Sequence, residues 1–514
     1  MPAPALLAVD VGTSSVKVAG FDPAGRLLAQ RRGGTPTERL PGGWAEHDVD
    51  ALWVLVAGLV NEVVTALPGF RVEAVAAASM GEAIVPVDEV GKAVRPAIAW
   101  YDPRGEAEAA WWAREVGRDV VYRTTGQVLD AHYGVNKLLW VRQHEPETFA
   151  LARHWLSIGD LVTYRLCGIY ATDFSLASRT MCFDQRRLDW SDELLGIADL
   201  DRSLFPQAHP SGSWIGAVTP AAAAATGLLT GTPVVAGGHD RLCAAFASRG
   251  NRPLPVDSTG SAEALVVPVE EYVERSTAEA GSIACYADVV PGQYVFSARV
   301  GYAGALVDWY RREVLGEDAS AGHLPVDAEI EWPLSFSGLL CYPSFGRVLA
   351  PVWDEAAAAG AVIGLTLGHH RSHILQALIE GVCYSLRANL DWLEQLTRRP
   401  VSALRVEGKV AASRAWVQLK ADVTGRCIET VRLEEATALG AALLAGIGCG
   451  MYPGHAAAGA AVEHELETRA PTPALAATYT DVFENGCRRL PGLVGDVAVV
   501  LSRATARASG PAGA

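Results

Sequence analysis

The segment Leu6 to Ala19, LLAVDVGTSSVKVA, constrains the fold of this chain more than any other. Leu6 to Val9 is typical of a buried strand, and Val16 to Phe21 resumes the strand pattern after a polar turn. Asp22 to Gly25 then predicts a second turn before Arg26 to Gln30, so we expect a β-hairpin here. A P-loop would instead enter a helix and carry a Gly-Lys-Ser/Thr ending, which is absent.

The first turn carries groups that suit a phosphate. Gly12 permits a tight turn. Thr13, Ser14 and Ser15 add hydroxyls and successive backbone N–H groups among which an anion can sit. A triphosphate would repel Asp10 unless a hard cation lay between them, so Asp10 predicts Mg²⁺ held partly through water. The same residue types are common in ordinary hairpin turns, and this turn by itself fits both interpretations.

Length and charge limit the classes of protein that this chain can represent. At 514 residues it exceeds the size of one growing core, so we expect two domains. Half of the residues are hydrophobic and 20% are charged, which predicts an ordered globular protein. The net charge is −15 and no basic run occurs, so nucleic acid is not an expected partner.

The cysteines and the N-terminus bear on location. Nine cysteines occur singly, with no CxxC pair, and are expected to be buried free thiols. The N-terminus lacks a positive region before its first strand and so does not resemble a signal peptide. No apolar run reaches the ~20 residues that span a bilayer, so a membrane is not an expected partner and the cytoplasm is the expected location.

The pattern along the chain predicts an α/β protein with two related halves. Up to about residue 240, strand-like runs alternate with helical stretches such as 51–67 and 104–115. PVVAGGHD at 233–240 ends a short apolar strand in glycines and an aspartate. VDSTGSAEALVV at 256–267 again places a Ser/Thr/Gly turn between two apolar runs, as the N-terminus does. Each half is thus expected to present a polar hairpin turn to a shared cleft.

Three later segments have recognisable patterns. Residues 372–396 predict a long amphipathic helix, and 401–406 predict a strand that ends at Glu407 and Gly408. Glu434 and Glu435 open an Ala/Gly-rich helix that runs to residue 447, whose small side chains would let another backbone approach closely. The last dozen residues lack periodicity and are expected to fray.

Eight motifs together resemble the FGGY carbohydrate kinases, close to the xylulokinase-like branch, over nearly the whole chain. They are DVGTSSVK near the start, PGGWAEHD (41–48), SMGEAIVPVD (79–88), RPAIAWYDPR (95–104), ATDFSLASRTMCFD (171–184), GGHDRLCAA (237–245), IGLTLGHHRSHILQALIEGVCYSLR (363–387) and LKADVTGRCIETVRLEEATALGAALLA (419–445). The resemblance implies two related actin-like domains, of the ribonuclease H-like (ASKHA) class, with a nucleotide and sugar cleft between them. It implies an N-terminal domain at 1–243, a C-terminal domain at 244–455, and a helical extension with a frayed tail at 456–514.

The resemblance also implies roles for individual residues. Asp240 matches the general base that accepts the proton of the attacking sugar hydroxyl, and it also contacts the substrate. The other residues implied to bind the sugar are Met80, Glu82, Trp100, Asp102, Arg104 and His132. Those implied to bind Mg-ATP, besides Asp10 for the metal, are Gly12, Thr13, Ser14, Ser15, Lys17, Ser258, Thr259, Gly260, Ser261, Gly304, Asp308, Gly408, Lys409 and Ser413.

Each of the main assignments has an ordinary structural alternative. Asp240 could cap the helix that follows it. Trp100 could belong to the core, because large aromatic side chains are mostly buried. Asp102 and Arg104 could form a surface ion pair, and His132 could be a packed or surface histidine.

Residues 407–411 depart from the family pattern. The family commonly has two or three consecutive glycines where this chain has Glu407, Gly408 and Lys409. Either Lys409 points outward and donates to a phosphate or to solvent, or the loop is rebuilt and nucleotide binding is altered.

These features together predict an ATP-dependent kinase that phosphorylates a hydroxyl of a small sugar or polyol. A ketopentose such as xylulose or ribulose is the expected acceptor, although residues 79–82 differ from the Gln-Met-His pattern of D-xylulose kinases. The alternatives are an actin-like ATPase switch, which needs no sugar pocket, and a sugar sensor that has lost ATP turnover. A homodimer is the default expectation for a soluble assembly.

Overall fold

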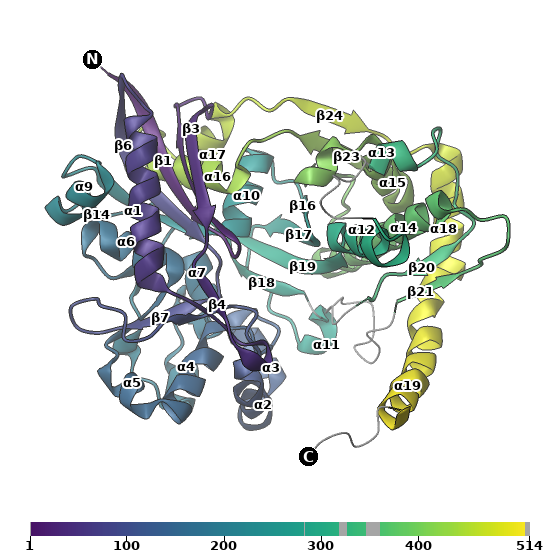
Figure 1. The fold of residues 1–514 in the computed structure, drawn as a ribbon, viewed down its shortest axis with the longest axis horizontal. Helices are drawn as coiled ribbons and strands as arrows, with labels where there is room; N and C mark the ends of the chain where they lie inside the picture. Colours follow the sequence, from purple (N-terminus) through teal and green to yellow (C-terminus); the bar gives the residue numbers. More distant parts are fainter. Residues whose placement is uncertain (1, 282, 318–325, 346–359, 509–514) are drawn as a thin grey trace.

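The computed structural model describes residues 2–281, 283–317, 326–345 and 360–508. These residues form two α/β lobes, with the N-terminal lobe on the left and the C-terminal lobe on the right of Figure 1. Within this part of the chain, no helix combines the length and apolar character that crossing a bilayer requires.

The N-terminal lobe is organised around a mixed sheet in the strand order β14-β15-β6-β1-β2-β3. Strands β1 and β2 form the predicted hairpin, while β1, β6 and β15 run parallel. Parallel strands place their carboxyl ends along one edge, which is where ligands bind in open α/β sheets. The strands are β1 (Ala3–Val11), β2 (Ser15–Phe21), β3 (Leu27–Gly34), β6 (Phe70–Ser79), β14 (Trp214–Ala217) and β15 (Pro233–His239).

The sheet of the C-terminal lobe repeats this arrangement. Its order is β18-β19-β17-β16-β22-β23-β24, and β16 pairs antiparallel with β17 but parallel with β22, as β1 does with β2 and β6. The predicted relation between the two halves is therefore confirmed by strand order and direction. The strands are β16 (Val256–Thr259), β17 (Ala262–Val269), β18 (Ala284–Ala287), β19 (Tyr294–Tyr302), β22 (Ala403–Glu407), β23 (Cys427–Val431) and β24 (Leu466–Arg469).

Smaller sheets surround these two. A sheet in the order β4-β5-β8-β7-β9 lies in the N-terminal lobe, and three strand pairs complete the described strands. They are β4 (Thr37–Arg39), β5 (Ala45–His47), β7 (Ile84–Val87), β8 (Ala97–Ile98), β9 (His154–Ser157), β10 (Ala171–Asp173) with β13 (Gln207–His209), β11 (Phe183–Asp184) with β12 (Asp189–Trp190), and β20 (Leu340–Tyr342) with β21 (Ala361–Ile363).

Helices cover the sheets and join the lobes. In the N-terminal lobe they are α1 (Val49–Thr65), α2 (Glu106–Glu115), α3 (Arg118–Thr125), α4 (Gly134–His144), α5 (Pro146–Leu151), α6 (Ile158–Cys167), α7 (Phe174–Ser178), α8 (Asp192–Ile197) and α9 (Pro220–Thr226). From there on they are α10 (Asp240–Arg249), α11 (Thr277–Ala280), α12 (Gly304–Trp309), α13 (Val326–Glu329), α14 (Arg371–Thr397), α15 (Arg414–Thr424), α16 (Ala436–Gly448), α17 (His455–Ala461), α18 (Pro473–Asn485) and α19 (Leu490–Ala508).

Helices α10 and α16 pack against each other between the lobes (Figure 1). Gly440 of α16 allows this contact, because a Cβ there would lie 2.0 Å from the carbonyl oxygen of Cys243. One buried cluster joins Leu6 of the N-terminal sheet, Val256 of the C-terminal sheet and Leu443 of α16. The small residues of α16 thus bring two backbones together, as the sequence predicts.

Two details at the domain limits stand out. The proposed boundary at 243/244 falls inside α10, the helix that links the lobes. The expectation of a frayed end is wrong for residues 503–508, which continue α19 as it extends away from the lobe in Figure 1. Residues 509–514 lie outside the described residues.

All nine cysteines are free, and seven of them are buried.

Candidate active site

The turn between β1 and β2 is as tight as the sequence predicts. The Gly12 N–H donates to the Ser15 carbonyl at 3.1 Å, and the Thr35 hydroxyl donates to the Gly12 carbonyl at 2.8 Å. Glycine suits this position, because a Cβ would lie 3.2 Å from the Ser15 carbonyl oxygen, which is a tight contact. Ser14 is exposed at the tip, so its hydroxyl is accessible to a ligand, whereas Thr13 and Ser15 are partly buried.

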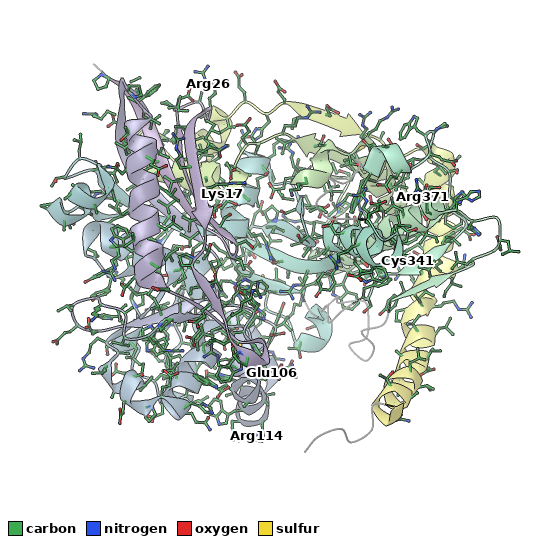
Figure 2. The ribbon with its side chains drawn as sticks, viewed as in Figure 1. Lys17, Arg26, Glu106, Arg114, Cys341 and Arg371 are labelled. Carbon is green, nitrogen blue, oxygen red and sulfur yellow. The ribbon has the colours of Figure 1, made fainter. Side chains whose placement is uncertain are left out.

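Asp10 is buried near the carboxyl end of β1, directly beside this turn. Burial, and secondly the negative charge of Asp240, raise the pKa of Asp10 to about 7. Lys17 faces Asp10 in the β1–β2 register, but its Nζ is paired with Glu435 Oε2 at 2.6 Å. Figure 2 shows Lys17 on the part of the N-terminal sheet that meets the C-terminal lobe. Lys17 therefore joins the lobes and only partly compensates Asp10.

A magnesium ion that is held jointly by Asp10 and the phosphates of a substrate fits this environment. Within the described ranges, no three His, Cys, Asp or Glu side chains gather to hold a metal by themselves. Mg²⁺ is commonly bound through one or two carboxylates together with substrate phosphates and water. Asp10 is such a carboxylate, and its raised pKa reflects a buried negative charge that a cation would stabilise.

Asp240 begins α10 at the carboxyl end of β15, along the same sheet edge as Asp10. His239 occupies the N-cap position without a side-chain cap bond, so Asp240 is not the N-cap residue. The Asp240 carboxylate accepts from the Arg241 N–H at 2.6 Å and lies 3.2 Å from His239 Nε2. Burial raises the pKa of Asp240 to about 6, although its side chain is still 32% exposed. The carboxylate can thus reach a ligand and be ionised at neutral pH.

His239 is held as a neutral neighbour of Asp240. Burial, and secondly the charge of Arg179, lower the pKa of His239 to about 3. Its backbone N–H donates to the Ser175 hydroxyl at 2.8 Å, which fixes the end of β15. A neutral imidazole can donate from Nε2 to Asp240 and hold that carboxylate in place.

Glu82 follows the carboxyl end of β6, the remaining one of the three parallel strands, and is paired with Arg179. Arg179 Nε donates to Glu82 Oε1 at 2.9 Å, and Arg179 Nη2 forms a second short contact with the same oxygen. Gly81 makes room for this arginine, since a Cβ there would lie 2.5 Å from Arg179 Cγ. Although burial opposes ionisation, Arg179 and then His132 hold the pKa of Glu82 well below its usual range.

His132 belongs to the same polar group. Its Nδ1 lies 2.8 Å from Asp130 Oδ1 and its Nε2 lies 3.7 Å from Glu82 Oε1. Lys137 is fully buried beneath it and donates to the His132 carbonyl. Burial lowers the pKa of Lys137 to about 8. His132 therefore lies among the ionised groups next to Glu82 and is not a surface histidine.

Trp100 links the sugar side to the phosphate turn. Its indole Nε1–H donates to the Thr13 hydroxyl at 2.8 Å. The guanidinium of Arg299, from β19 of the opposite lobe, lies 6.0 Å from the centre of the indole ring. Trp100 is only partly buried, so its position at the junction of the lobes differs from that of a core tryptophan.

Asp102, Arg104 and Met80 are buried, unlike Trp100. The side chains of Asp102 and Arg104 are 0% and 2% exposed, and Arg104 pairs with both Asp102 and Glu46. Asp102 Oδ2 also accepts from the Ala45 N–H at 2.7 Å. They are therefore not a surface pair, and their polar atoms are already engaged. Met80 is 3% exposed and packs in the core. In this conformation these three side chains are not exposed to a ligand.

Three glycine-containing segments meet at the corresponding edge of the C-terminal sheet. The Gly304 N–H donates to the Gly260 carbonyl at 2.9 Å, and a Cβ on Gly304 would lie 2.8 Å from that oxygen. Gly408 has φ +86°, and a Cβ there would lie 2.6 Å from the Thr259 carbonyl oxygen. The β16–β17 turn, the start of α12 and the end of β22 thus form one glycine-lined surface, which lets a ligand approach the backbone.

The side chains around this surface are arranged in two ways. Thr259 points inward, where its hydroxyl accepts from Lys420 Nζ at 2.8 Å. Ser261, Asp308 and Lys409 are exposed. Lys409 begins a 3₁₀ turn without a positive φ, so lysine is accommodated there without backbone strain. The structure thus corresponds to the first alternative, in which Lys409 points outward. Ser413 caps α15 and donates to Asp327 at 2.6 Å.

Sequence patterns did not reveal three arginines of the site. Arg179 lies within the 171–184 motif, but only Gly81, far away in the sequence, makes room for it. Arg241 directly follows Asp240, and Arg299 comes from a strand that looks like any buried strand in sequence. The alternation of Ser297 and Arg299 on β19 is the one signal that could have marked a polar face there.

Family models and known proteins match this chain over most of its length. The model described as "FGGY family of carbohydrate kinases, N-terminal domain" matches residues 5–247, and the corresponding C-terminal domain matches residues 260–449. A glycerol kinase of Methylibium petroleiphilum is 31% identical over 466 residues, which cover 87% of this chain and 91% of that protein. A xylulose kinase of Bacillus subtilis is 25% identical over 459 residues, which cover 87% and 89%.

Solved structures give the same result for the fold. The xylulose kinase from Rhodospirillum rubrum aligns with a TM-score of 0.85 at 27% sequence identity, covering 94% of this chain and 97% of that one. The relatives include both glycerol and xylulose kinases, so similarity alone leaves the acceptor sugar or polyol open.

Proposed function

This chain belongs to the FGGY family of carbohydrate kinases and is an ATP-dependent phosphotransferase with an alcohol acceptor; from this premise we propose how its residues carry out the transfer. The observation that carries the proposal is the placement of Asp10, Glu82 and Asp240 at the carboxyl ends of three parallel strands. The acceptor binds between Glu82, His132 and Trp100, and the nucleotide binds across the lobes.

Asp240 is the general base in this proposal. With a pKa of about 6, its carboxylate is ionised at neutral pH and can accept the proton of the acceptor hydroxyl at Oδ2, while His239 holds Oδ1. In a loose phosphoryl-transfer transition state the proton leaves late, so the position of the base matters more than its strength. Such a base commonly contributes about 10²- to 10⁴-fold in rate.

The phosphates of ATP lie between the two polar turns. Residues 13–15 offer hydroxyls and amides from one lobe, and the glycine-lined surface of Gly260, Gly304 and Gly408 offers backbone from the other. Asp10 would hold Mg²⁺, which when bound neutralises charge on the phosphates. Closure of the lobes around both substrates would exclude water as a competing acceptor.

The acceptor is a small polyhydroxy compound, and a ketopentose such as xylulose or ribulose is the acceptor that the sequence motifs favour. A coupled ADP-release assay with ATP and Mg²⁺ tests this directly, using xylulose, ribulose and glycerol as acceptors. Acceptor-dependent ADP release supports the kinase. ATP hydrolysis at the same rate with and without every acceptor would instead indicate an ATPase switch, and ATP binding without turnover would indicate a sensor.

A further inference from the structure

Two arginines from different elements lie close together beside residues that we propose to bind the acceptor. Arg241 is the second residue of α10, next to Asp240, and Arg299 lies on β19 of the C-terminal lobe. Arg241 Nη1 approaches the hydroxyl of Ser297, two residues before Arg299 on the same face of β19, at 3.5 Å. The Arg299 guanidinium lies over Trp100. The two cations therefore lie near each other, next to Asp240 and Trp100.

Their charges are not neutralised in the way that those of neighbouring arginines are. Arg179 is paired with Glu82, and Arg104 is paired with Asp102 and Glu46. In the described part of the chain, neither Arg241 nor Arg299 forms an ion pair with a carboxylate within 4.0 Å. Both side chains are nevertheless partly buried. Burial, and secondly the charge of Arg241, lower the pKa of Arg299, as expected for two cations held close together.

A bound anion would remove this mutual repulsion. The guanidinium group is planar, remains charged at all relevant pH values, and matches a carboxylate with two parallel hydrogen bonds. A neutral sugar or polyol has no group that compensates two positive charges. A substrate with one carboxylate and several hydroxyls would satisfy both arginines and leave hydroxyls for Asp240 and Glu82.

We propose that Arg241 and Arg299 form a carboxylate subsite, and that the preferred acceptor is a small polyhydroxy acid, an aldonate, whose hydroxyl is phosphorylated. This proposal rests on the proposed kinase function and specifies its acceptor class, with an aldonate in place of the ketopentose that the sequence motifs favour. The bond formed joins the acceptor oxygen to the γ-phosphorus of ATP, the bond broken releases ADP, and the hydroxyl proton goes to Asp240. The carboxylate itself takes no part in the transfer.

The position of the arginines distinguishes the acceptor from the nucleotide as the source of the anion. The carboxylates that act most strongly on Arg299 are Glu82 and Asp130, which belong to the acceptor side. Those that act on Asp10, at the phosphate side, are Asp240 and Glu435, and the cation there is Lys17. Because Arg299 also lies over Trp100 and Arg241 follows Asp240, we place the subsite at the acceptor end of the cleft.

The test measures ADP release with matched acid and neutral acceptors, namely D-erythronate with erythritol, D-xylonate with D-xylulose, and D-gluconate with sorbitol. The wild-type enzyme is expected to show at least about tenfold higher kcat/KM for an acid than for its neutral partner. Arg299→Gln should lower kcat/KM for the acid at least about tenfold, mainly through KM, and change that of the neutral acceptor less than about twofold. Arg299→Lys should restore part of the loss, because it restores the charge.

Controls separate this proposal from loss of folding and from nucleotide binding. Arg399→Gln removes an exposed arginine, paired with Glu270, and should leave all values unchanged. Melting temperatures show whether Arg299→Gln is folded. If that variant fails to fold, Arg241→Gln supplies the same comparison.

Three outcomes would overturn the subsite. They are a neutral acceptor preferred over its acid, equal losses for both acceptors in Arg299→Gln, and a raised KM for ATP with an unchanged KM for the acid. In each of these the kinase function stands. If neither acids nor neutral acceptors stimulate ADP release by the wild-type enzyme, the proposed function itself fails.

Discussion

The buried pair of Glu82 and Arg179 allows a quantitative test of how the acceptor pocket is held together. Their side chains are 9% and 10% exposed, and Arg179 Nε lies 2.9 Å from Glu82 Oε1. Arg179→Met preserves the volume of the side chain but leaves the Glu82 carboxylate buried without its main partner. Breaking a buried ion pair in this way commonly costs about 3–5 kcal/mol.

Replacing Glu82 instead of Arg179 should lower the free energy of unfolding by a smaller amount. In Glu82→Gln the arginine loses its carboxylate but still lies 5.1 Å from the ring centres of both Tyr133 and Tyr286, and each such contact contributes about 0.5–2 kcal/mol. The double variant Arg179→Met/Glu82→Gln leaves neither charge unpaired. It should therefore be more stable than the sum of the single changes predicts, with a coupling energy of about 1–3 kcal/mol.

Urea unfolding followed by tryptophan fluorescence measures these differences. Arg186→Met is the matched control, because Arg186 pairs with Glu274 at an exposed site, where an ion pair is worth less than about 1 kcal/mol. Additive effects of the two single changes, or an Arg179→Met variant as stable as the Arg186→Met control, would refute the reasoning.

Three further predictions concern the phosphate side and the base. Asp10→Asn should raise the melting temperature of the ligand-free protein above pH 7. The pKa of Asp10 in the folded protein is raised from 3.8 to about 7, so ionisation of Asp10 opposes folding by up to about 4 kcal/mol at high pH. The stability gained by Asp10→Asn should therefore shrink toward pH 4, and an equal gain at both pH values would contradict this prediction. Because Asp240 has a pKa of about 6, kcat/KM should fall about tenfold per pH unit below that value, and a flat pH profile down to pH 5 would exclude its ionisation from the rate. Lys409→Gly should change the Kd for ATP less than about twofold, whereas Gly408→Ala should weaken it at least tenfold through its positive φ and its contact with Thr259; calorimetric titration measures both, and similar effects would show that the loop differs from this description.

Local patterns in the sequence predicted the elements that depend on nearby residues. The β1–β2 hairpin, the long helix α14 and the small-residue helix α16 all appear close to their expected limits. Residues 503–508 were not expected to be helical, and they continue α19. Two short turns in the sequence indicated the relation between the halves. The sheets confirm it, because β16 pairs with β17 and β22 as β1 pairs with β2 and β6.

Contacts between distant segments were harder to foresee. The pair of Arg179 and Glu82 needs the space that Gly81 leaves, and Lys17 is paired with Glu435 of the other lobe. Asp102 and Arg104 have the sequence spacing of a pocket motif, yet the Glu46 carboxylate and the Ala45 backbone already engage them. Such pairings depend on tertiary packing, which sequence spacing does not encode.

The central claim is that Asp240 removes the proton of the acceptor hydroxyl in a cleft where it lies with Asp10. The most direct measurement is kcat for acceptor-dependent ADP release by Asp240→Asn at saturating ATP, Mg²⁺ and acceptor, with ATP binding and melting temperature measured in parallel. The account predicts a folded variant that binds ATP normally but turns over at least about 100-fold more slowly. Turnover within a few fold of the wild-type value would contradict it.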